Sequence, residues 1–110
     1  AQRFCFLGYL PQEKAARAQA IRRLANDFIR DGITRIFIET PYRNEALWED
    51  CLRLLPQNAY LGVGLNICGI DEYIDCKQVA EWNSLPFKPA KAPAVFLFGN
   101  KATIHPSNTK

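Results

Sequence analysis

Hydrophobic residues along the chain follow two patterns, short continuous apolar runs and longer stretches in which they recur with a helical period. Continuous runs of this length, bounded by glycine, proline or polar residues, are typical of β-strands that are buried on both faces. We therefore expect the first strand, with its run Phe4 to Leu7, to be covered on both sides. The five predicted strands are residues 3–8, 35–39, 60–67, 72–76 and 94–98.

The first predicted helix follows the first strand. It begins near Pro11, because proline is tolerated in a first helical turn, and Gly32 is the expected C-terminal cap. Its polar face is rich in arginine, which allows either an RNA-facing surface or, more commonly, a solvated helix face in which acidic residues are interspersed. Its buried stripe at positions i, i+3, i+4 and i+7 is formed by Ile21, Leu24, Ala25 and Phe28.

Two further helices are predicted in the second half of the chain. Asn44 is a good N-cap for a helix over residues 45–55, which Pro56 ends. Residues 77–82 predict a brief third helix. Residues 84–93 contain three prolines and therefore predict an extended loop before the last strand.

The order of these elements predicts an α/β fold with a mixed sheet. The first three strands are joined by helices and should run parallel with right-handed connections. The connection between residues 60–67 and 72–76 is too short for a parallel crossover, so these two strands should form an antiparallel hairpin. The last strand is apolar throughout and should be central.

Length and composition narrow the function classes. A chain of 110 residues suffices for one domain, and a net charge of +3 gives no footprint for nucleic acid by itself. No apolar run is long enough for a membrane span and no signal peptide is recognisable, so we expect a cytoplasmic protein without a membrane partner. The chain contains no methionine and enters almost at once on a strand, which favours a domain excised from a longer protein.

The sequence lacks the usual signatures of metal sites and nucleophilic catalysis. No pair of cysteines has the C-x-x-C spacing, so reduced, buried thiols are favoured over a disulfide framework or a zinc site. The one histidine, His105, lies in a polar tail predicted for residues 103–110. The four cysteines are Cys5, Cys51, Cys68 and Cys76.

Two features inside the predicted elements allow both a structural and a functional interpretation. Gly62 and Gly64 are poor candidates for a dinucleotide-binding loop, because they lie within a strand, and they are better explained by close approach of a chain segment or a ligand. Trp48 could stack on a ligand, but a core aromatic is the commoner role.

The loop after the second strand carries the main candidate residues. Glu39 ends the strand because Pro41 cannot continue a ladder, and ligands of open α/β sheets bind beyond the carboxyl ends of strands. Glu39 could accept hydrogen bonds from a ligand or cap a nearby backbone amide. Arg43 could bind an anionic group or pair with Glu39 or Glu45.

Three stretches resemble the tetrapyrrole methylase superfamily, in family order and spacing. Residues 6–11 (F-L-G-Y-L-P), followed by Lys14 and Arg17, are similar to its F-x-G-F-L-P stretch. Residues 38–43 (I-E-T-P-Y-R) resemble the Y-E-S-P-H-R motif of the branch that includes the ribose-methylating small-subunit ribosomal RNA methyltransferases, the closest branch. Residues 93–99 (P-A-V-F-L-F-G) resemble the family's final strand.

The resemblance implies the C-terminal domain, residues 1–102, of a two-domain methyltransferase that uses S-adenosylmethionine. It also implies a five-stranded mixed sheet in the order 1-2-5-3-4 and a cofactor cleft shared with an N-terminal domain of the same polypeptide. Without that domain the chain should be inactive. By position, the implied cofactor-binding residues are Glu39, Thr40, Asn66, Ile67, Pro93 and Ala94, and the implied substrate-side residues are Tyr9, Tyr42 and Arg43.

The resemblance leaves the methyl acceptor open between a tetrapyrrole and ribosomal RNA. Residues 64–68 read G-L-N-I-C where the ribosomal branch usually has A-R-E-L-T, and Tyr42 replaces that branch's histidine. These departures weaken the case for an RNA substrate. A hypothesis of another class is a self-sufficient, non-catalytic α/β binding module. An isolated half should expose an apolar patch where its partner domain lay, and we therefore also expect a homodimer.

Overall fold

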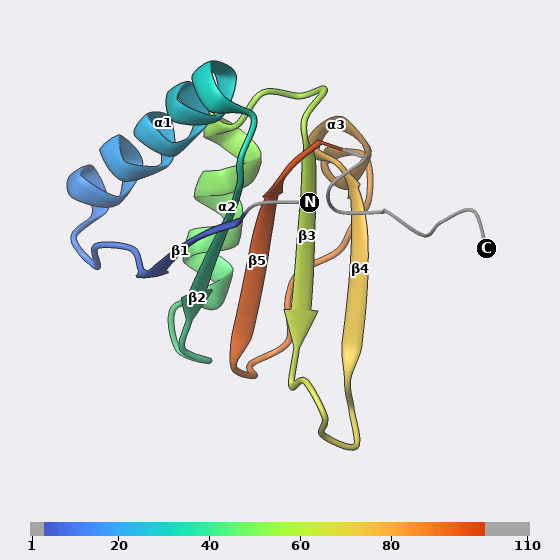
Figure 1. Ribbon diagram of the computed structural model, residues 1–110. Coiled ribbons are helices and arrows are strands. Elements are labelled where there is room, and N and C mark those ends of the chain that lie inside the picture. The colour runs from blue at the N-terminus through green and yellow to red at the C-terminus, as the bar shows by residue number, and fades with distance from the viewer. Residues whose placement is uncertain (1–3, 101–110) are drawn as a thin grey trace.

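The described part of the chain forms five strands and three helices, which follow one another in the predicted order (Figure 1). The computed structural model describes residues 4–100, so the end of the predicted domain at residue 102 and the predicted tail with His105 lie outside the described residues. The strands are β1 (Phe4–Tyr9), β2 (Thr34–Glu39), β3 (Tyr60–Leu65), β4 (Tyr73–Gln78) and β5 (Ala94–Gly99). The helices are α1 (Lys14–Asp31), α2 (Asn44–Leu54) and α3 (Val79–Asn83).

The strands form one mixed sheet in the order β1-β2-β5-β3-β4. β1 pairs with β2 in parallel, β5 lies antiparallel between β2 and β3, and β3 and β4 form the predicted antiparallel hairpin. The predicted α/β class, the mixed sheet and the strand order are therefore confirmed. β5 is central as expected, and its Phe96 and Phe98 are fully buried.

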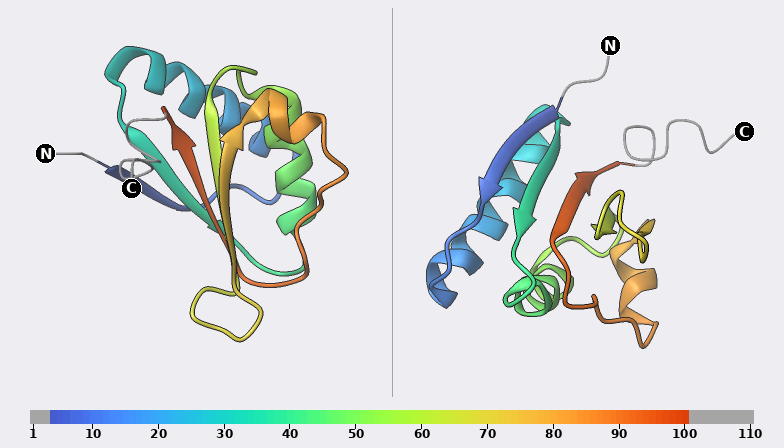
Figure 2. Two further views of the ribbon diagram at one scale, coloured as in Figure 1. Left: turned by 90° about the vertical axis from the view of Figure 1, so that its right-hand side faces the viewer. Right: turned by 90° about the horizontal axis from the view of Figure 1, so that it is seen from below.

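All three helices lie on one side of the sheet (Figures 1 and 2). The side chains that alternate toward this side form the hydrophobic core, including Leu61, Val63 and Leu65 of β3. Trp48 of α2 is 1% exposed and packs edge-on against Trp82 of α3, with ring centroids 4.9 Å apart. Its interpretation as a core aromatic is confirmed.

The first helix starts later than its sequence predicts. Glu13 is the N-cap, and its Oε1 accepts a hydrogen bond of 2.8 Å from the Ala16 N–H, so the helix begins at Lys14 and not near Pro11. The predicted C-cap is confirmed, because Gly32 has a φ of 68° and its N–H donates to the Phe28 carbonyl at 2.7 Å.

The expectation that the first strand is covered on both faces is wrong. β1 lies at the edge of the sheet, where Phe4 is 50% and Phe6 is 65% exposed. None of the helices α1, α2 and α3 covers the face to which these rings belong. A continuous apolar run shows that both faces avoid charge, but it does not show that both faces are covered within the same chain.

The prediction that Asn44 caps the second helix is also wrong. Arg43 occupies the N-cap position, and Asn44 is the first helical residue. The Asn44 side chain does not cap the helix but binds the loop before β5. Its Nδ2 donates to the carbonyls of Ala90 and Ala92, at 2.7 Å and 2.9 Å. The asparagine therefore fixes the predicted extended loop immediately before Pro93, which the local sequence around Asn44 does not reveal.

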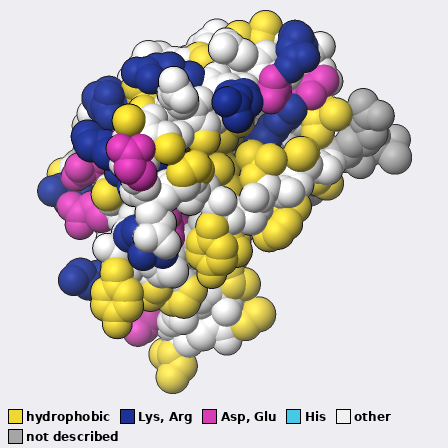
Figure 3. All heavy atoms as spheres, turned by 90° about the vertical axis from the view of Figure 1, so that its left-hand side faces the viewer, with side chains coloured by type: hydrophobic (Ala, Val, Ile, Leu, Met, Phe, Trp, Pro, Cys, Tyr) yellow, Lys and Arg dark blue, Asp and Glu magenta, His cyan; other side chains and the backbone are white. Residues whose placement is uncertain are grey.

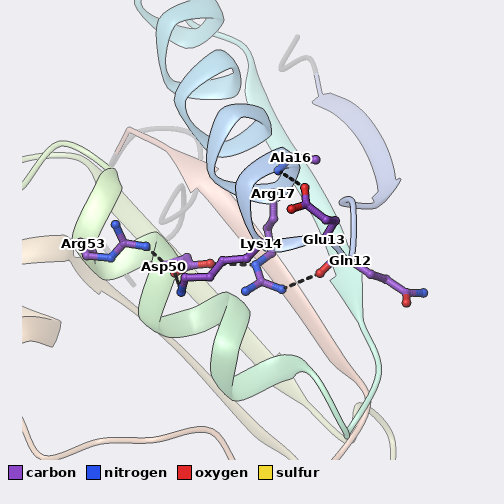
Figure 4. A network of polar contacts seen from close by, with 7 residues as sticks. All are labelled: Gln12, Glu13, Lys14, Ala16, Arg17, Asp50 and Arg53. Carbon is purple, nitrogen blue, oxygen red and sulfur yellow. Dashed lines mark hydrogen bonds and ion pairs between the residues drawn. The ribbon is translucent and has the colours of Figure 1, made fainter.

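A buried ion-pair network joins the first two helices (Figure 4). The Arg17 Nε donates to Asp50 Oδ2 at 2.8 Å, and Arg53 donates to the other carboxylate oxygen at 2.6 Å. Burial raises the pKa of the Asp50 carboxyl, but the hydrogen bonds from Arg17 and Arg53 outweigh it and hold the pKa below its ordinary value. Arg17 belongs to the helix beneath β1, so the network anchors that helix to α2.

All four cysteines lie within the described residues and none forms a disulfide, as expected, but the expectation that they are buried holds only for Cys51. Burial raises the pKa of the Cys51 thiol well above its usual value and raises that of Cys76 to about 12. Neither thiol is therefore activated as a nucleophile at neutral pH. Among the described residues, no helix is long and apolar enough to cross a membrane.

Replacing Asn44 by alanine should lower the free energy of unfolding by about 1–3 kcal/mol, because the Ala90 and Ala92 carbonyls lose their donor. Urea unfolding followed by circular dichroism measures this loss. The matched control is Asn26→Ala on the exposed face of α1, which should stay within about 0.5 kcal/mol of the parent chain. Equal effects of the two substitutions would contradict the proposed role of Asn44.

The Asp50 network should make stability fall in acid. Because the pKa of Asp50 is lower in the folded chain, the unfolded chain binds more protons, and stability is lost as the pH falls below about 4. Asp50→Asn should be less stable at pH 7 and should show a shallower fall between about pH 5 and 3. Urea unfolding across this pH range measures the change in stability. The control is Glu49→Gln at an exposed neighbouring position, which should show the same fall of stability with pH as the parent chain.

Candidate functional site

The sheet order brings the ends of β2 and β3 together on either side of the start of β5. Ala94, the first residue of β5, pairs with Glu39 at the end of β2 and with Leu65 at the end of β3. Two polar loops therefore leave the sheet at the same edge, next to the segment that enters β5. This is the edge at which open α/β sheets bind ligands.

A cavity of about 260 Å³ lies at this edge. It contains six of the nine residues that the family resemblance implied, drawn from four separate segments of the chain. Its volume is below the range of about 300–1,000 Å³ that is typical of complete small-molecule sites, so it forms part of a site and not a whole one. The lining residues are Tyr9, Ile38, Glu39, Asn66, Ile67, Pro93, Ala94 and Val95.

A bulge in the first strand places Tyr9 in the cavity wall. The register of β1 against β2 shifts between Phe6 and Gly8, and Gly8 has a φ of 68°, a conformation that favours glycine. After the bulge, Tyr9 pairs with Ile38, which also lines the cavity. A regular strand would turn Tyr9 to the helical side of the sheet.

The turn after β3 supplies Asn66 and Ile67. The strand ends at Leu65, two residues before the predicted end, because Asn66 takes a φ of 52° that asparagine tolerates well. The Asn66 N–H donates to the Pro93 carbonyl at 3.0 Å, which joins this turn to the segment entering β5.

Gly64 lets the Ile67 side chain fold back over the sheet. A Cβ atom at Gly64 would lie 2.8 Å from the Ile67 Cδ1. This agrees with the expectation that the strand glycines permit the close approach of a chain segment. Ile67 thereby lies between the cavity and a wider groove over β3, β4 and β5.

Only one of the two oxygens of the buried Glu39 carboxylate accepts hydrogen bonds within the described residues. Its Oε1 accepts from the Thr40 N–H at 2.8 Å and from the Arg43 Nε at 3.2 Å. Within residues 4–100, Oε2 has no hydrogen-bond partner, although the Glu39 side chain is 1% exposed, and the Thr40 Oγ1 is also buried without a partner. Because a buried carboxylate oxygen needs donors, these two atoms mark a place for ligand N–H or O–H groups.

Two of the implied substrate-side residues do not line the cavity. Tyr42 is 85% exposed on the loop between β2 and α2. Arg43 lies beside the cavity through its ion pair with Glu39, so the pairing with Glu39 is the alternative that the structure adopts. Glu45 instead pairs with Lys88, at 3.4 Å.

The wider groove has a volume of about 530 Å³ and a different character. It is lined mainly by apolar side chains and strand glycines of β3, β4 and β5, and neither orphaned oxygen of Glu39 and Thr40 borders it. The smaller cavity is therefore the better candidate for recognition of a polar ligand. Sequence reasoning missed Ile38 and Val95 as lining residues, although their alternation with the buried Phe37 and Phe96 places them on the cavity side.

The described part of the chain offers no metal centre, since it contains no group of three histidine, cysteine, aspartate or glutamate side chains that could hold an ion. The lining residues therefore supply the Glu39 carboxylate, the Asn66 amide, the Tyr9 hydroxyl, backbone groups and an apolar wall, and the Thr40 hydroxyl follows Glu39 in the chain. Such a set can bind and orient a ligand.

Comparison with known proteins gives a structural match. No family model and no curated protein sequence matches the chain. Its fold is similar to the crystal structure of the methyltransferase CobJ, with a TM-score of 0.56 and 15% sequence identity over 92% of this chain. The chain spans 42% of the length of that protein. At this identity the likeness establishes a methyltransferase-like fold for the chain.

Proposed function

We propose that this chain is the C-terminal domain of an S-adenosylmethionine-dependent methyltransferase of the tetrapyrrole methylase superfamily. The fold likeness to the methyltransferase CobJ supports this, as do the three motifs in residues 6–11, 38–43 and 93–99. The match to 42% of CobJ's length is consistent with a domain that requires a second one. In this proposal an N-terminal domain of the same polypeptide supplies the rest of the cofactor cleft.

The observation that carries the proposal is the unpaired Oε2 of Glu39 at the cavity edge. S-adenosylmethionine presents N–H groups on its adenine and amino group and O–H groups on its ribose, and each can donate to such a carboxylate. The cofactor therefore fits the donor and acceptor set of the site. Thr40 adds a hydroxyl, and the cavity wall at Asn66, Ile67 and Ala94 adds backbone and apolar surface.

The role of the residues is positioning. When bound, S-adenosylmethionine supplies a methyl group that is already activated on a sulfonium, so the protein has to align it with the acceptor and exclude water. The apolar residues Ile38, Ile67 and Val95 serve to exclude water in this scheme. The absence of an activated thiol at Cys51 or Cys76 agrees with a reaction that needs no protein nucleophile.

For the methyl acceptor we favour a tetrapyrrole over ribosomal RNA. Proteins bind RNA largely through cationic contacts to phosphates, and no lysine or arginine lines either the cavity or the wider groove beside it. Arg43, which the resemblance implied for the substrate side, already pairs with the cavity residue Glu39. This arrangement offers few cationic contacts to the phosphates of an RNA.

Titration with S-adenosylhomocysteine, followed by backbone-amide NMR, tests the proposed cofactor wall. We expect the largest chemical-shift changes at the amides of Asn66, Ile67 and Ala94, which line the cavity, and of Thr40, which donates to the cavity residue Glu39. Binding is expected to be weak, since the chain forms only part of the cleft. An absence of shifts at millimolar ligand, or shifts confined to the helical side, would contradict the proposal.

Replacing Glu39 by glutamine should weaken this binding roughly tenfold or more, because one charge-assisted hydrogen bond is lost. The substitution keeps an oxygen that can accept from Thr40 and Arg43, but it turns the unpaired Oε2 into an N–H donor. The fold should therefore survive. The NMR titration measures the affinity, and the exposed Glu49→Gln serves as control. Equal affinities of the two variants would exclude Glu39 as a cofactor ligand.

A further inference from the structure

The segment that enters β5 forms one wall of the cavity but has few groups with which to anchor itself. Residues 90–93 read A-K-A-P, in which the alanine side chains carry no polar group and Pro93 has no backbone N–H. Pro93 and Ala94 line the cavity, so the position of this segment decides the shape of that wall. Donors from other parts of the chain therefore have to hold the segment in place.

Asn44 supplies such donors from the start of α2. Its Nδ2 donates to the Ala90 carbonyl at 2.7 Å and to the Ala92 carbonyl at 2.9 Å, and the residue is 1% exposed. The Ala92 N–H donates to the Ala90 carbonyl at 2.8 Å, which closes a γ-turn around Lys91. One buried side-chain amide thus binds the carbonyls at both ends of this turn.

The turn is connected to the cavity through the next two residues of the chain. The Pro93 carbonyl accepts from the Asn66 N–H at 3.0 Å, and Ala94 pairs with Glu39 of β2. A displacement of the turn therefore moves Pro93 and Ala94 relative to Asn66 and Glu39. Asn44 does not line the cavity itself, so its effect on a ligand acts through this wall.

The start of α2 also holds the other wall of the cavity. Arg43, the N-cap residue, donates from its Nε to Glu39 Oε1 at 3.2 Å, and Asn44 follows it as the first helical residue. Glu45 pairs at 3.4 Å with Lys88, in the loop that leads to β5. Figure 1 shows that the connection from β2 to α2 and the segment that enters β5 lie at the same end of the sheet. Three consecutive residues therefore tie both walls to one helix.

We propose that Asn44 is the positioning residue of the cavity. It holds the wall formed by Pro93 and Ala94 at a fixed position relative to Glu39 before a ligand arrives. Without the Asn44 amide the segment samples several positions, and the free energy needed to order it is subtracted from the free energy of binding. The consequence for S-adenosylmethionine rests on the proposed function, whereas the effect on the wall itself does not.

Hydrogen exchange of the ligand-free chain tests the effect on the wall. The Asn66 amide should exchange roughly tenfold faster in Asn44→Ala than in the parent chain, because its acceptor, the Pro93 carbonyl, is no longer held in place. The control is Ile21→Val, fully buried on α1, which loses stability through a small cavity and should leave the local exchange of the Asn66 amide unchanged. Equal exchange rates of this amide in Asn44→Ala and the parent chain would overturn the proposal.

Titration with S-adenosylhomocysteine, followed by amide NMR at a temperature where the variants are folded, tests the effect on binding. Asn44→Ala should raise the dissociation constant roughly fivefold or more. A residue that only stabilises the fold would lower the urea midpoint without changing the affinity of the folded chain, and Ile21→Val should behave in this way. Asn26→Ala lies on the exposed face of α1, on the side where Figure 3 shows basic side chains, and should change neither quantity. Equal dissociation constants of Asn44→Ala and Ile21→Val would count against the positioning role.

A second variant, Ala90→Gly, keeps the test decisive if Asn44→Ala does not fold. Ala90 is exposed and the Asn44 amide is retained, so the fold should survive, but glycine loosens the turn. We expect faster exchange of the Asn66 amide and binding weakened about twofold. Parent-like exchange and binding in Ala90→Gly would overturn the proposal where Asn44→Ala is unfolded. A parent chain that binds no S-adenosylhomocysteine would instead contradict the proposed function, and the exchange of the Asn66 amide would then decide the positioning role by itself.

Discussion

The insertion of β5 between β2 and β3 is the constraint on which the rest of the structure depends. β2 and β3 follow one another in the chain and run in the same direction, but β5 lies between them in the sheet. The start of β5 therefore lies between the ends of β2 and β3. Ala94 thereby contacts the ends of both neighbours, and the hydrogen bond from Asn66 to the Pro93 carbonyl closes this edge. The loop before β5 is held in turn by Asn44 at the start of α2. The cavity is thus a product of topology, assembled from segments that are far apart in the chain.

The polar character of the cavity depends on the burial of the Glu39 carboxylate. Glu39 has one oxygen engaged by Thr40 and Arg43 and another with no partner among the described residues. A buried unpaired carboxylate oxygen contributes nothing to stability, and this is consistent with the cofactor-binding role proposed for Glu39. Arg43 compensates the charge without occupying the whole carboxylate. In the proposed function, Oε1 holds the Glu39 side chain in place through Thr40 and Arg43, and Oε2 is left to accept from the ligand.

Covering only one face of the sheet with helices has a second consequence. The helical side holds the core and, through Arg17 and Asp50, an ion-pair network that fixes the two long helices. The opposite side remains apolar, with rings at β1 and hollows at β3. Exposed apolar faces on a protein commonly mark interaction sites or ligand-binding grooves. The cavity lies at one edge of this face, since the exposed Tyr9 also lines the cavity.

The sequence by itself determined the class of the fold and the identity of most elements, since strand runs, helical periods and proline positions are local signals. It also determined, through the family resemblance, the strand order and six residues that the structure brings to one cavity. It did not determine that β1 has an open face or that Asn44 holds a distant loop, because both depend on which segments become neighbours. Only the tertiary structure showed that Glu39 keeps an unpaired oxygen, since hydrogen-bond satisfaction is a property of packing and not of spacing along the chain.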